Sequence, residues 1–353
     1  MADKHPFSDI AWDVTEPEYR ADPALSYSTL QRYERNGRFR ALPTLEEKQS
    51  SPSLTFGSVV DALVTGGYGE FDSLFMVADF PEISEALQNI ATVLFERYGK
   101  EKNFDDILDD ELAQVGQECN YYAGSKYTAY RSKLIRENCR EYYNILSSAT
   151  DKTLISQKDY NDALACKEAF LESPYTQGCF TAEIQRDQEL YYQLKFKGID
   201  EQTGIIYRCM ADIIKVCHLD KIVYPFDVKT SSKPEEDFYK SYLEWLYNLQ
   251  SRNYWRLIRK AMDKDPYYKE FKLADYTFLV VNRNTRTPLA WRDTMTQVQG
   301  DVVYKTASGR TYTIRDPYTI GREIVHYKLE GSRYPDLEVG YSNSITESII
   351  KKL

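Results

Sequence analysis

The sequence lacks the short motifs that mark several large enzyme classes. Only three of its 353 residues are histidines, and none lies in an H-E-x-x-H zinc-binding pattern. It contains neither a G-x-x-x-x-G-K-[ST] phosphate loop nor a G-x-S-x-G nucleophile elbow. These absences argue against a zinc protease, an ATP-driven helicase and a serine hydrolase.

Paired cysteines and long apolar segments are also missing. None of the six cysteines forms a C-x-x-C pair, so a zinc ribbon or a clustered redox site is not expected. This usage is typical of reduced thiols in a cytoplasmic protein. No apolar run approaches the length of a membrane span, and the first residues lack the apolar region of a signal peptide. We therefore expect a cytoplasmic protein with no membrane partner.

The chain has no excess of basic residues, because 45 Lys and Arg are outnumbered by 54 Asp and Glu, for a net charge of −9. A nonspecific nucleic-acid coat protein is usually basic, so this balance argues against one. A nuclease remains compatible, since a carboxylate site adds negative charge and a local basic stripe can still bind phosphates. Thirty tyrosines suggest extensive half-buried surface or subunit contact.

The first half of the sequence has a helical pattern. Residues 1–24 are polar and contain prolines, which predicts an extended arm. Ser26 is expected to cap a helix over 27–36 that stops at Gly37. A second helix is predicted from Thr55 to the Gly66–Gly67 pair. Residues 82–171 are helical nearly throughout with no strand-like alternation, so we expect 25–180 to be mostly helical.

The pattern changes at Thr181. Three strand-like runs follow, over 182–198, 205–216 and 221–231. A long helix over about 235–262, a strand at 276–282 and a final helix over 316–330 come next. This order predicts an α/β protein whose residues 181–353 form a mixed β-sheet core flanked by helices, compact with 25–180.

The second and third strand-like runs place two carboxylates together. The short loop 218–221 predicts a hairpin in which Cys217 faces Ile222, so Asp212 lies opposite Asp227. Such cross-strand neighbours have Cβ atoms roughly 4.5–5.5 Å apart. Two facing carboxylates repel each other unless a cation lies between them. Ligation by oxygen alone predicts Mg²⁺, with Mn²⁺ as a substitute.

Two further groups are expected at this pair. Lys229 follows Asp227 by two residues and therefore points to the same face, where an ammonium could orient or deprotonate water or stabilise charge on a phosphate. If Lys197 faces Gly204, Glu189 lies opposite Asp212 as a third carboxylate. The loop between these strands is long enough for a different register, so Glu183 is the alternative.

The long predicted helix carries a polar residue within an apolar stripe. Gln250 lies in this stripe, and its buried amide needs partners, which could be the carboxylates, Lys229 or a DNA end. Each of these residues alone has an ordinary structural explanation, and the order and geometry of the set carry the functional interpretation. The stripe consists of Leu243, Tyr247, Gln250, Tyr254, Leu257 and Ala261.

The set resembles the PD-(D/E)XK nucleases, and the longer match, over about 25–282, resembles the RecE/RecB-like phage exonucleases. The resemblance rests on the motif aspartate, the D-x-K-T strand, the Q-x-x-x-Y helix and two weaker N-terminal elements. In this sequence they are Asp212; Asp227, Lys229 and Thr230; Gln250 and Tyr254; Leu25-Ser26-Tyr27-Ser28; and Gly57-Ser58-Val59-Val60-Asp61. Asp61 stands where relatives carry a histidine.

The resemblance implies a restriction-endonuclease-like fold and Mg²⁺-dependent hydrolysis of DNA, without an iron–sulfur cluster. It implies attack on the 5′ ends of linear duplexes by a homo-oligomeric ring that works with a single-strand annealing protein, in the host cytoplasm if a phage encodes the chain. The implied catalytic residues are Asp212, Asp227, Lys229, Glu189 and Gln250. The implied metal ligands are Asp61, Asp212, Asp227 and Val228. The implied DNA contacts are Thr230, Ser231, Gln250, Arg252 and Tyr254, with Arg256, Arg259 and Lys260 as further basic candidates.

Two alternatives remain open at this stage. The same core could belong to an endonuclease or a junction-resolving enzyme, which would also cut closed circular DNA. The chain could instead be an inactive module that binds DNA ends, an alternative that the replacement of histidine by Asp61 supports.

Overall fold

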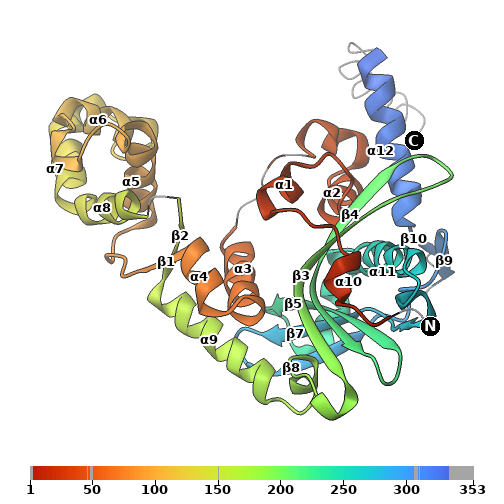
Figure 1. Cartoon of the computed structure of the whole chain (residues 1–353). Helices are drawn as coiled ribbons and strands as arrows, with labels where there is room; N and C mark the ends of the chain where they lie inside the picture. The colour runs from red at the N-terminus through yellow and green to blue at the C-terminus, as the bar shows by residue number, and fades with distance from the viewer. Residues whose placement is uncertain are drawn as a thin grey trace. The chain divides into compact units, whose positions relative to one another are not determined.

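The computed structural model describes residues 3–45, 47, 51–149, 151–305, 309 and 311–333. The chain divides into two compact units. The first unit comprises Met1–Gly57 and Cys166–Leu353, and the second comprises Ser58–Ala165. The sequence predicts divisions after residues 24 and 180, with 25–180 and 181–353 in one compact body, whereas the two units divide the chain at Gly57 and Ala165. Figure 1 shows the elements of both units.

The first unit is built on a mixed β-sheet, so the expected α/β class is confirmed. Its strands have the order β3-β4-β5-β7-β8, and the short β6 also pairs with β5. Only the β5 pairings with β6 and β7 are parallel. The strands are β3 Gln188–Ile199, β4 Ile206–Cys217, β5 Ile222–Ser231, β6 Lys272–Leu273, β7 Thr277–Asn282 and β8 Pro288–Arg292.

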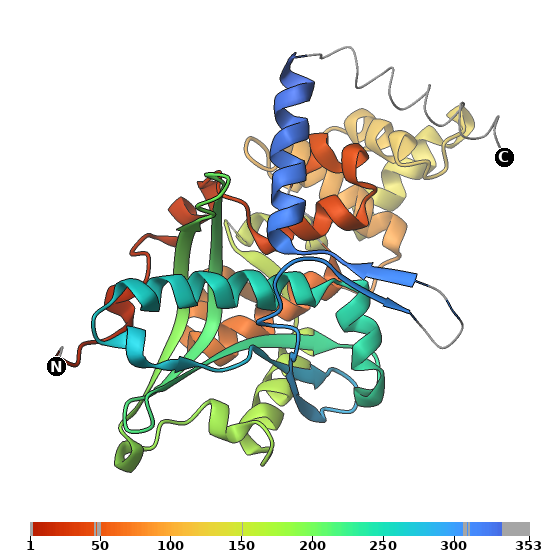
Figure 2. The ribbon, with the colours of Figure 1, turned by 90° about the vertical axis from the view of Figure 1, so that its right-hand side faces the viewer.

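The three strand-like runs and the 276–282 strand are therefore confirmed as β3, β4, β5 and β7. Helix α11 (Tyr247–Lys264) packs against β3 and β4, as Figure 2 shows. Leu257 of its apolar stripe and the adjacent Ile258 are buried in the core cluster that also contains Ile214 of β4 and Val280 of β7. This packing places one face of α11 over the strands that carry the predicted carboxylates.

The prediction of one helix over 235–262 was wrong. The structure has α10 (Phe238–Glu244) and α11, separated at Leu246, whose φ of 55° is left-handed. Leu243 is 45% exposed and does not belong to the buried stripe. No glycine or proline marks this break. Packing of Phe238 and Tyr242 into the core accompanies it, and a local pattern does not report such packing.

The N-terminal residues are not an extended arm, contrary to expectation. They form a 3-10 helix over Phe7–Ile10 and helix α1 (Glu16–Ala21), with Phe7 and Tyr19 buried. The next helix, α2 (Tyr27–Arg35), is confirmed. Its Ser26 side chain accepts from the backbone N–H of Thr29, as a helix cap does.

Two further predicted helices are confirmed. Helix α3 (Pro52–Thr65) matches the helix predicted from Thr55, and α12 (Pro317–Arg333) matches the helix predicted over 316–330. Helix α9 (Gln157–Glu172) precedes the sheet. An antiparallel pair, β9 (Val302–Lys305) and β10 (Thr311–Ile314), precedes α12.

The second unit is mostly helical, with its own apolar core around Ile90, Leu94, Leu112 and Ile135. It also contains a two-stranded parallel sheet, which corrects the expectation that 82–171 has no strand. A four-residue strand is too short to show a period, and its partner lies far away in the sequence. The elements are α4 Gly67–Leu74, β1 Phe75–Ala78, α5 Glu85–Tyr98, α6 Asp109–Glu118, α7 Thr128–Asn138, α8 Arg140–Ser148 and β2 Thr153–Ser156.

Among the described helices, none has both the length and the apolar composition that a membrane span requires.

Candidate active site

The two predicted carboxylates lie on neighbouring antiparallel strands. The β4–β5 ladder pairs Cys217 with Ile222 and continues to Ile213 and Phe226, so the predicted hairpin register is confirmed. The next step along this register sets Asp212 opposite Asp227. Asp212 Oδ2 accepts a 2.8 Å hydrogen bond from the backbone N–H of Val228. A local turn of four residues has therefore brought together two carboxylates that are fifteen positions apart.

Lys229 and Gln250 both contact Asp227. The Lys229 ammonium forms an ion pair with Asp227 Oδ2, and the Gln250 side-chain N–H donates to Asp227 Oδ1. Asp227 is 1% exposed and Gln250 is 4% exposed. Within the described part of the chain, Gln250 Oε1 is buried and has no hydrogen-bond partner. The amide expected to need partners therefore has one on Asp227 and retains an unused acceptor.

The electrostatics of this group follow from its burial. Removal from water raises the pKa of Asp227 above its ordinary value, although Lys229 acts in the opposite direction. Burial tends to lower the pKa of Lys229, but the combined effects of Asp227, Tyr247 and Asp212 outweigh burial and the pKa is raised. The ammonium therefore remains protonated at neutral pH. In this state the group carries a positive charge and can donate hydrogen bonds.

Tyrosines to which the sequence analysis assigned no role at the site also lie near this group. The Lys229 ammonium lies 5.3 Å from the ring centroid of Tyr247. Burial raises the pKa of Tyr27 and of Tyr276 well above the ordinary value, and the negative charge of Asp227 raises both further. These hydroxyls stay protonated as a result. Tyr27 and Tyr247 do occur in the N-terminal element and in the helical stripe named above, but neither pattern indicates a place beside the carboxylates.

Glu189 is not part of the site, which corrects the expected third carboxylate. The β3–β4 ladder pairs Lys197 with Arg208 and Glu189 with Val216. The loop that connects β3 to β4 has the predicted length, but it begins two residues later in the chain than predicted. The residue of β3 opposite Asp212 is therefore Gln193 and not Glu189. Glu189 instead forms an ion pair with Lys4 at 3.1 Å, and its other carboxylate oxygen lies 3.2 Å from Nε2 of His218. The alternative, Glu183, precedes the strand next to a 3-10 helix.

Gln193 has a left-handed backbone, with a φ of 53°. Its neighbours Tyr192 and Leu194 are paired with Ile213 and Ala211, so the irregularity lies beside Asp212. For a residue other than glycine this conformation costs about 1–2 kcal/mol. Strained positions of this kind cluster at functional sites.

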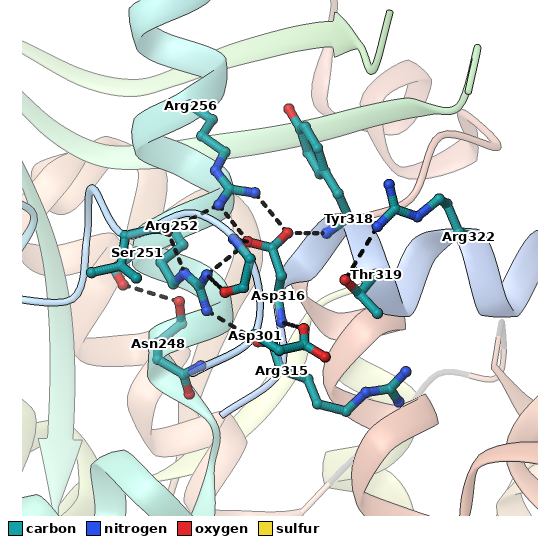
Figure 3. Close-up of polar contacts among 12 residues, drawn as sticks. Asn248, Ser251, Arg252, Arg256, Asp301, Arg315, Asp316, Tyr318, Thr319 and Arg322 are labelled. Atoms are coloured by element: carbon teal, nitrogen blue, oxygen red, sulfur yellow. Dashed lines mark hydrogen bonds and ion pairs between the residues drawn. The ribbon is translucent and has the colours of Figure 1, made fainter. Parts of the chain in front are cut away.

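Three of the expected DNA contacts, Gln250, Arg252 and Tyr254, are buried in the protein, which corrects their assignment as DNA contacts. Arg252 has no exposed surface, because its guanidinium bonds to Asp316 at 2.7 Å and to three backbone carbonyls (Figure 3). Tyr254 is 8% exposed and packs edge-on against Tyr276. None of the three side chains can reach a DNA strand in this arrangement.

Thr230 and Ser231 are half-buried at the end of β5. The Thr230 hydroxyl lies 3.4 Å from the position that a Cβ on Gly57 would occupy, so Gly57 permits a close approach. The Ser231 hydroxyl accepts from the backbone N–H of Lys233 at 3.0 Å and supports the turn after the strand. The predicted DNA contacts of Thr230 and Ser231 remain predictions.

The donor set can be compared with what Mg²⁺ requires. Asp212, Asp227 and the unused Gln250 Oε1 supply oxygens, and Mg²⁺ usually binds through one or two carboxylates while keeping several waters. These donors therefore fit such an ion. Among the described residues, no group of three or more His, Cys, Asp or Glu side chains could hold a metal. Asp61 lies on α3 in the second unit, and its role and that of Val228 as ligands stay predictions.

Comparisons with known proteins found no family model that matches the chain, and no curated protein with significant sequence similarity.

Proposed function

We propose that this chain is a Mg²⁺-dependent deoxyribonuclease with a restriction-endonuclease-like core. The observation that carries the proposal is the group formed by Asp212, Asp227, Lys229 and Gln250. Two carboxylates, an ammonium and an amide meet on one side of a mixed sheet, and Asp227 is contacted by two of the others. This set has the chemistry expected of phosphodiester hydrolysis, which develops negative charge on the phosphate.

Each residue has a defined task in this proposal. Asp212, Asp227 and Gln250 Oε1 would hold the cation, and Mg²⁺ supplies Lewis-acid stabilisation of the phosphate when bound. Lys229 remains protonated, so it stabilises charge on the phosphate or orients the attacking water by donating a hydrogen bond. The Gln250 N–H fixes one Asp227 oxygen, which orients the carboxylate toward the cation.

The finer proposal is an exonuclease that degrades linear double-stranded DNA, from 5′ to 3′, in phage-type recombination or DNA processing. It rests on the spacing of motifs shared with the RecE/RecB-like exonucleases. A homo-oligomeric ring and a single-strand annealing partner belong to the same proposal. A ring would reconcile the net charge of −9 with DNA binding, since cationic side chains need only line the channel.

The decisive experiment compares linear with closed circular duplex DNA. The purified protein should release short products from linear DNA in Mg²⁺ or Mn²⁺ and none in EDTA, and closed circles should persist. Release from a 5′-labelled end supports the proposed polarity, whereas release from the 3′ label alone reverses it. Cutting of circles at a similar rate would replace the exonuclease by an endonuclease or junction resolvase.

The Glu189→Gln variant should retain nuclease activity within about twofold of the wild type. Glu189 lies four positions from the residue opposite Asp212, and its partners Lys4 and His218 lie outside the site. The same assay on linear DNA measures this. If Glu189→Gln lost nearly as much activity as an Asp227 variant, the pairing of β3 with β4 described above would not hold in the active enzyme.

A second candidate is an inactive module that binds DNA ends. The finding that favours it is the absence of a three-ligand cluster within the described residues. Calorimetry with Mn²⁺ separates the two proposals. Saturable binding that Asp212→Asn abolishes supports the enzyme. Duplex-end binding with no Mn²⁺ binding and no degradation supports the module.

A further inference from the structure

A pocket of about 400 Å³ lies in the first unit, on the other side of α11 from the carboxylates. Its walls come from α11, the β3–β4 loop, the segment around Gly300 and the start of α12. Gln250 and Tyr254 face the carboxylate site, whereas Arg256 and Arg259 project from the opposite helical face. The volume is typical of small-molecule sites, which span roughly 300–1,000 Å³.

The pocket is cationic although the chain is acidic. Four cationic and two anionic side chains line it, so its formal charge is +2, against −9 for the whole chain. The two carboxylates of the pocket, Asp316 and Asp200, already accept hydrogen bonds from the protein. Asp316 is held by Arg252 and Arg256, and Asp200 accepts from the Thr203 hydroxyl and the backbone N–H of Gln202. The cations are Arg256, Arg259, Lys260 and Arg322.

Two of the cations have hydrogen-bond donors to spare. Within the described residues, the Arg322 guanidinium makes one hydrogen bond, to the Thr319 hydroxyl at 3.3 Å, and no ion pair. Figure 3 shows Arg322 on α12 beside Thr319 and Tyr318. The Lys260 ammonium donates to the Ile199 carbonyl, and Glu201 lies 4.0 Å away. A guanidinium carries five N–H donors and an ammonium three, so both can donate to an anion.

The rest of the lining suits a larger ligand than a bare phosphate. Trp255 adds an aromatic ring to the lining. The Tyr318 ring is already engaged, because it stacks on Tyr207 with centroids 4.6 Å apart and the Arg256 guanidinium lies 4.8 Å from its centroid. Gln202 and Gln299 add amide donors and acceptors. Aromatic rings stack on nucleobases, and guanidinium groups recognise phosphate oxygens. The hydrogen bonds of Asp316 hold the walls in place before any ligand arrives.

We infer that this pocket binds a nucleoside monophosphate group, with the phosphate on Arg322 and Lys260 and the base against Trp255. The group comes either from a free nucleotide or from the terminal nucleotide of a single strand. The inference is independent of the proposed hydrolysis, because none of these residues belongs to the carboxylate site.

Calorimetry on the full chain in EDTA tests the inference without hydrolysis. The probes are dAMP, a 5′-phosphorylated hexanucleotide and inorganic phosphate. The wild type should bind dAMP or the hexanucleotide saturably, and inorganic phosphate more weakly. Arg322→Glu should weaken binding at least tenfold, and Lys260→Gln severalfold. Arg292→Glu is the matched control, because Arg292 is exposed on β8 with Asp275 only at 4.0 Å, and it should bind as the wild type does.

The two sources are separated by which probe binds. Binding of dAMP that depends on Arg322 identifies a free-nucleotide site. Binding of the hexanucleotide alone, with the same dependence, identifies a strand-end site. The inference is overturned if the wild type binds neither probe, or if both Arg322→Glu and Lys260→Gln bind them with wild-type affinity.

Discussion

The variants Lys229→Ala and Asp227→Asn should each lower the rate of DNA hydrolysis by about 10²–10³-fold or more, the size of effect expected when a group that stabilises transition-state charge is removed. Both residues lie at the centre of the site, where the ammonium forms an ion pair with a carboxylate that is 1% exposed. The readout is the initial rate of product release from linear duplex DNA in Mg²⁺.

Metal affinity separates the tasks of the two residues. Lys229→Ala keeps both carboxylates and removes a competing positive charge, so its affinity for Mn²⁺ should equal or exceed that of the wild type. Asp227→Asn should weaken Mn²⁺ binding, because an amide oxygen replaces a charged ligand. Glu189→Gln serves as the matched control for both measurements. If Lys229→Ala were fully active, or if Asp227→Asn bound Mn²⁺ with wild-type affinity, the proposed assignments would be wrong.

The variant Asp316→Ala should lower the free energy of unfolding by about 3–5 kcal/mol, the cost of breaking a buried ion pair by removing one partner. Asp316 accepts from Arg252 at 2.7 Å, from Arg256 at 2.8 Å and from the backbone N–H of Gly300 at 3.0 Å. Arg252 has no exposed surface, so the variant leaves a buried guanidinium without its carboxylate.

Urea denaturation measures this loss. The matched control is Asp263→Ala, which removes a carboxylate from Arg259 at an exposed ion pair and should cost at most about 1 kcal/mol. If both variants lost the same free energy of unfolding, burial would not explain the stabilising effect of the Asp316 ion pairs.

The contribution of Asp316 should also depend on pH. Burial alone raises the pKa of this carboxyl, but the hydrogen bonds from Arg256 and the backbone N–H of Tyr318, together with the charges of Arg256 and Arg252, outweigh burial, so the pKa lies below the ordinary 3.8. Because the folded pKa is depressed, the stabilisation is fully present above the unfolded value and is lost as pH falls through the folded value. The difference in stability between the wild type and Asp316→Asn should be constant from pH 5 to 7 and should shrink below about pH 4. A constant difference down to pH 2 would contradict this.

Local sequence alone determined the centre of the site. A four-residue loop between two alternating strands leaves little freedom of register, so the pairing of Cys217 with Ile222 could be counted forward to Asp212 and Asp227. Lys229 follows from the two-residue period of a strand, and the buried face at Gln250 follows from the period of a helix. The α/β class came from the same two periods.

Tertiary structure decided what lies further apart. The six-residue β3–β4 loop could form at more than one place, and its actual position exchanged Glu189 for Gln193 beside Asp212. Arginine is usually a surface residue, so the sequence does not indicate that Arg252 is buried. In the structure its guanidinium is buried and bonds to Asp316, which lies 64 residues away in the sequence. The break at Leu246 accompanies packing of α10 and has no local marker. Periodicity reports which face of an element is apolar. Which distant residue meets that face depends on contacts that only the folded chain creates.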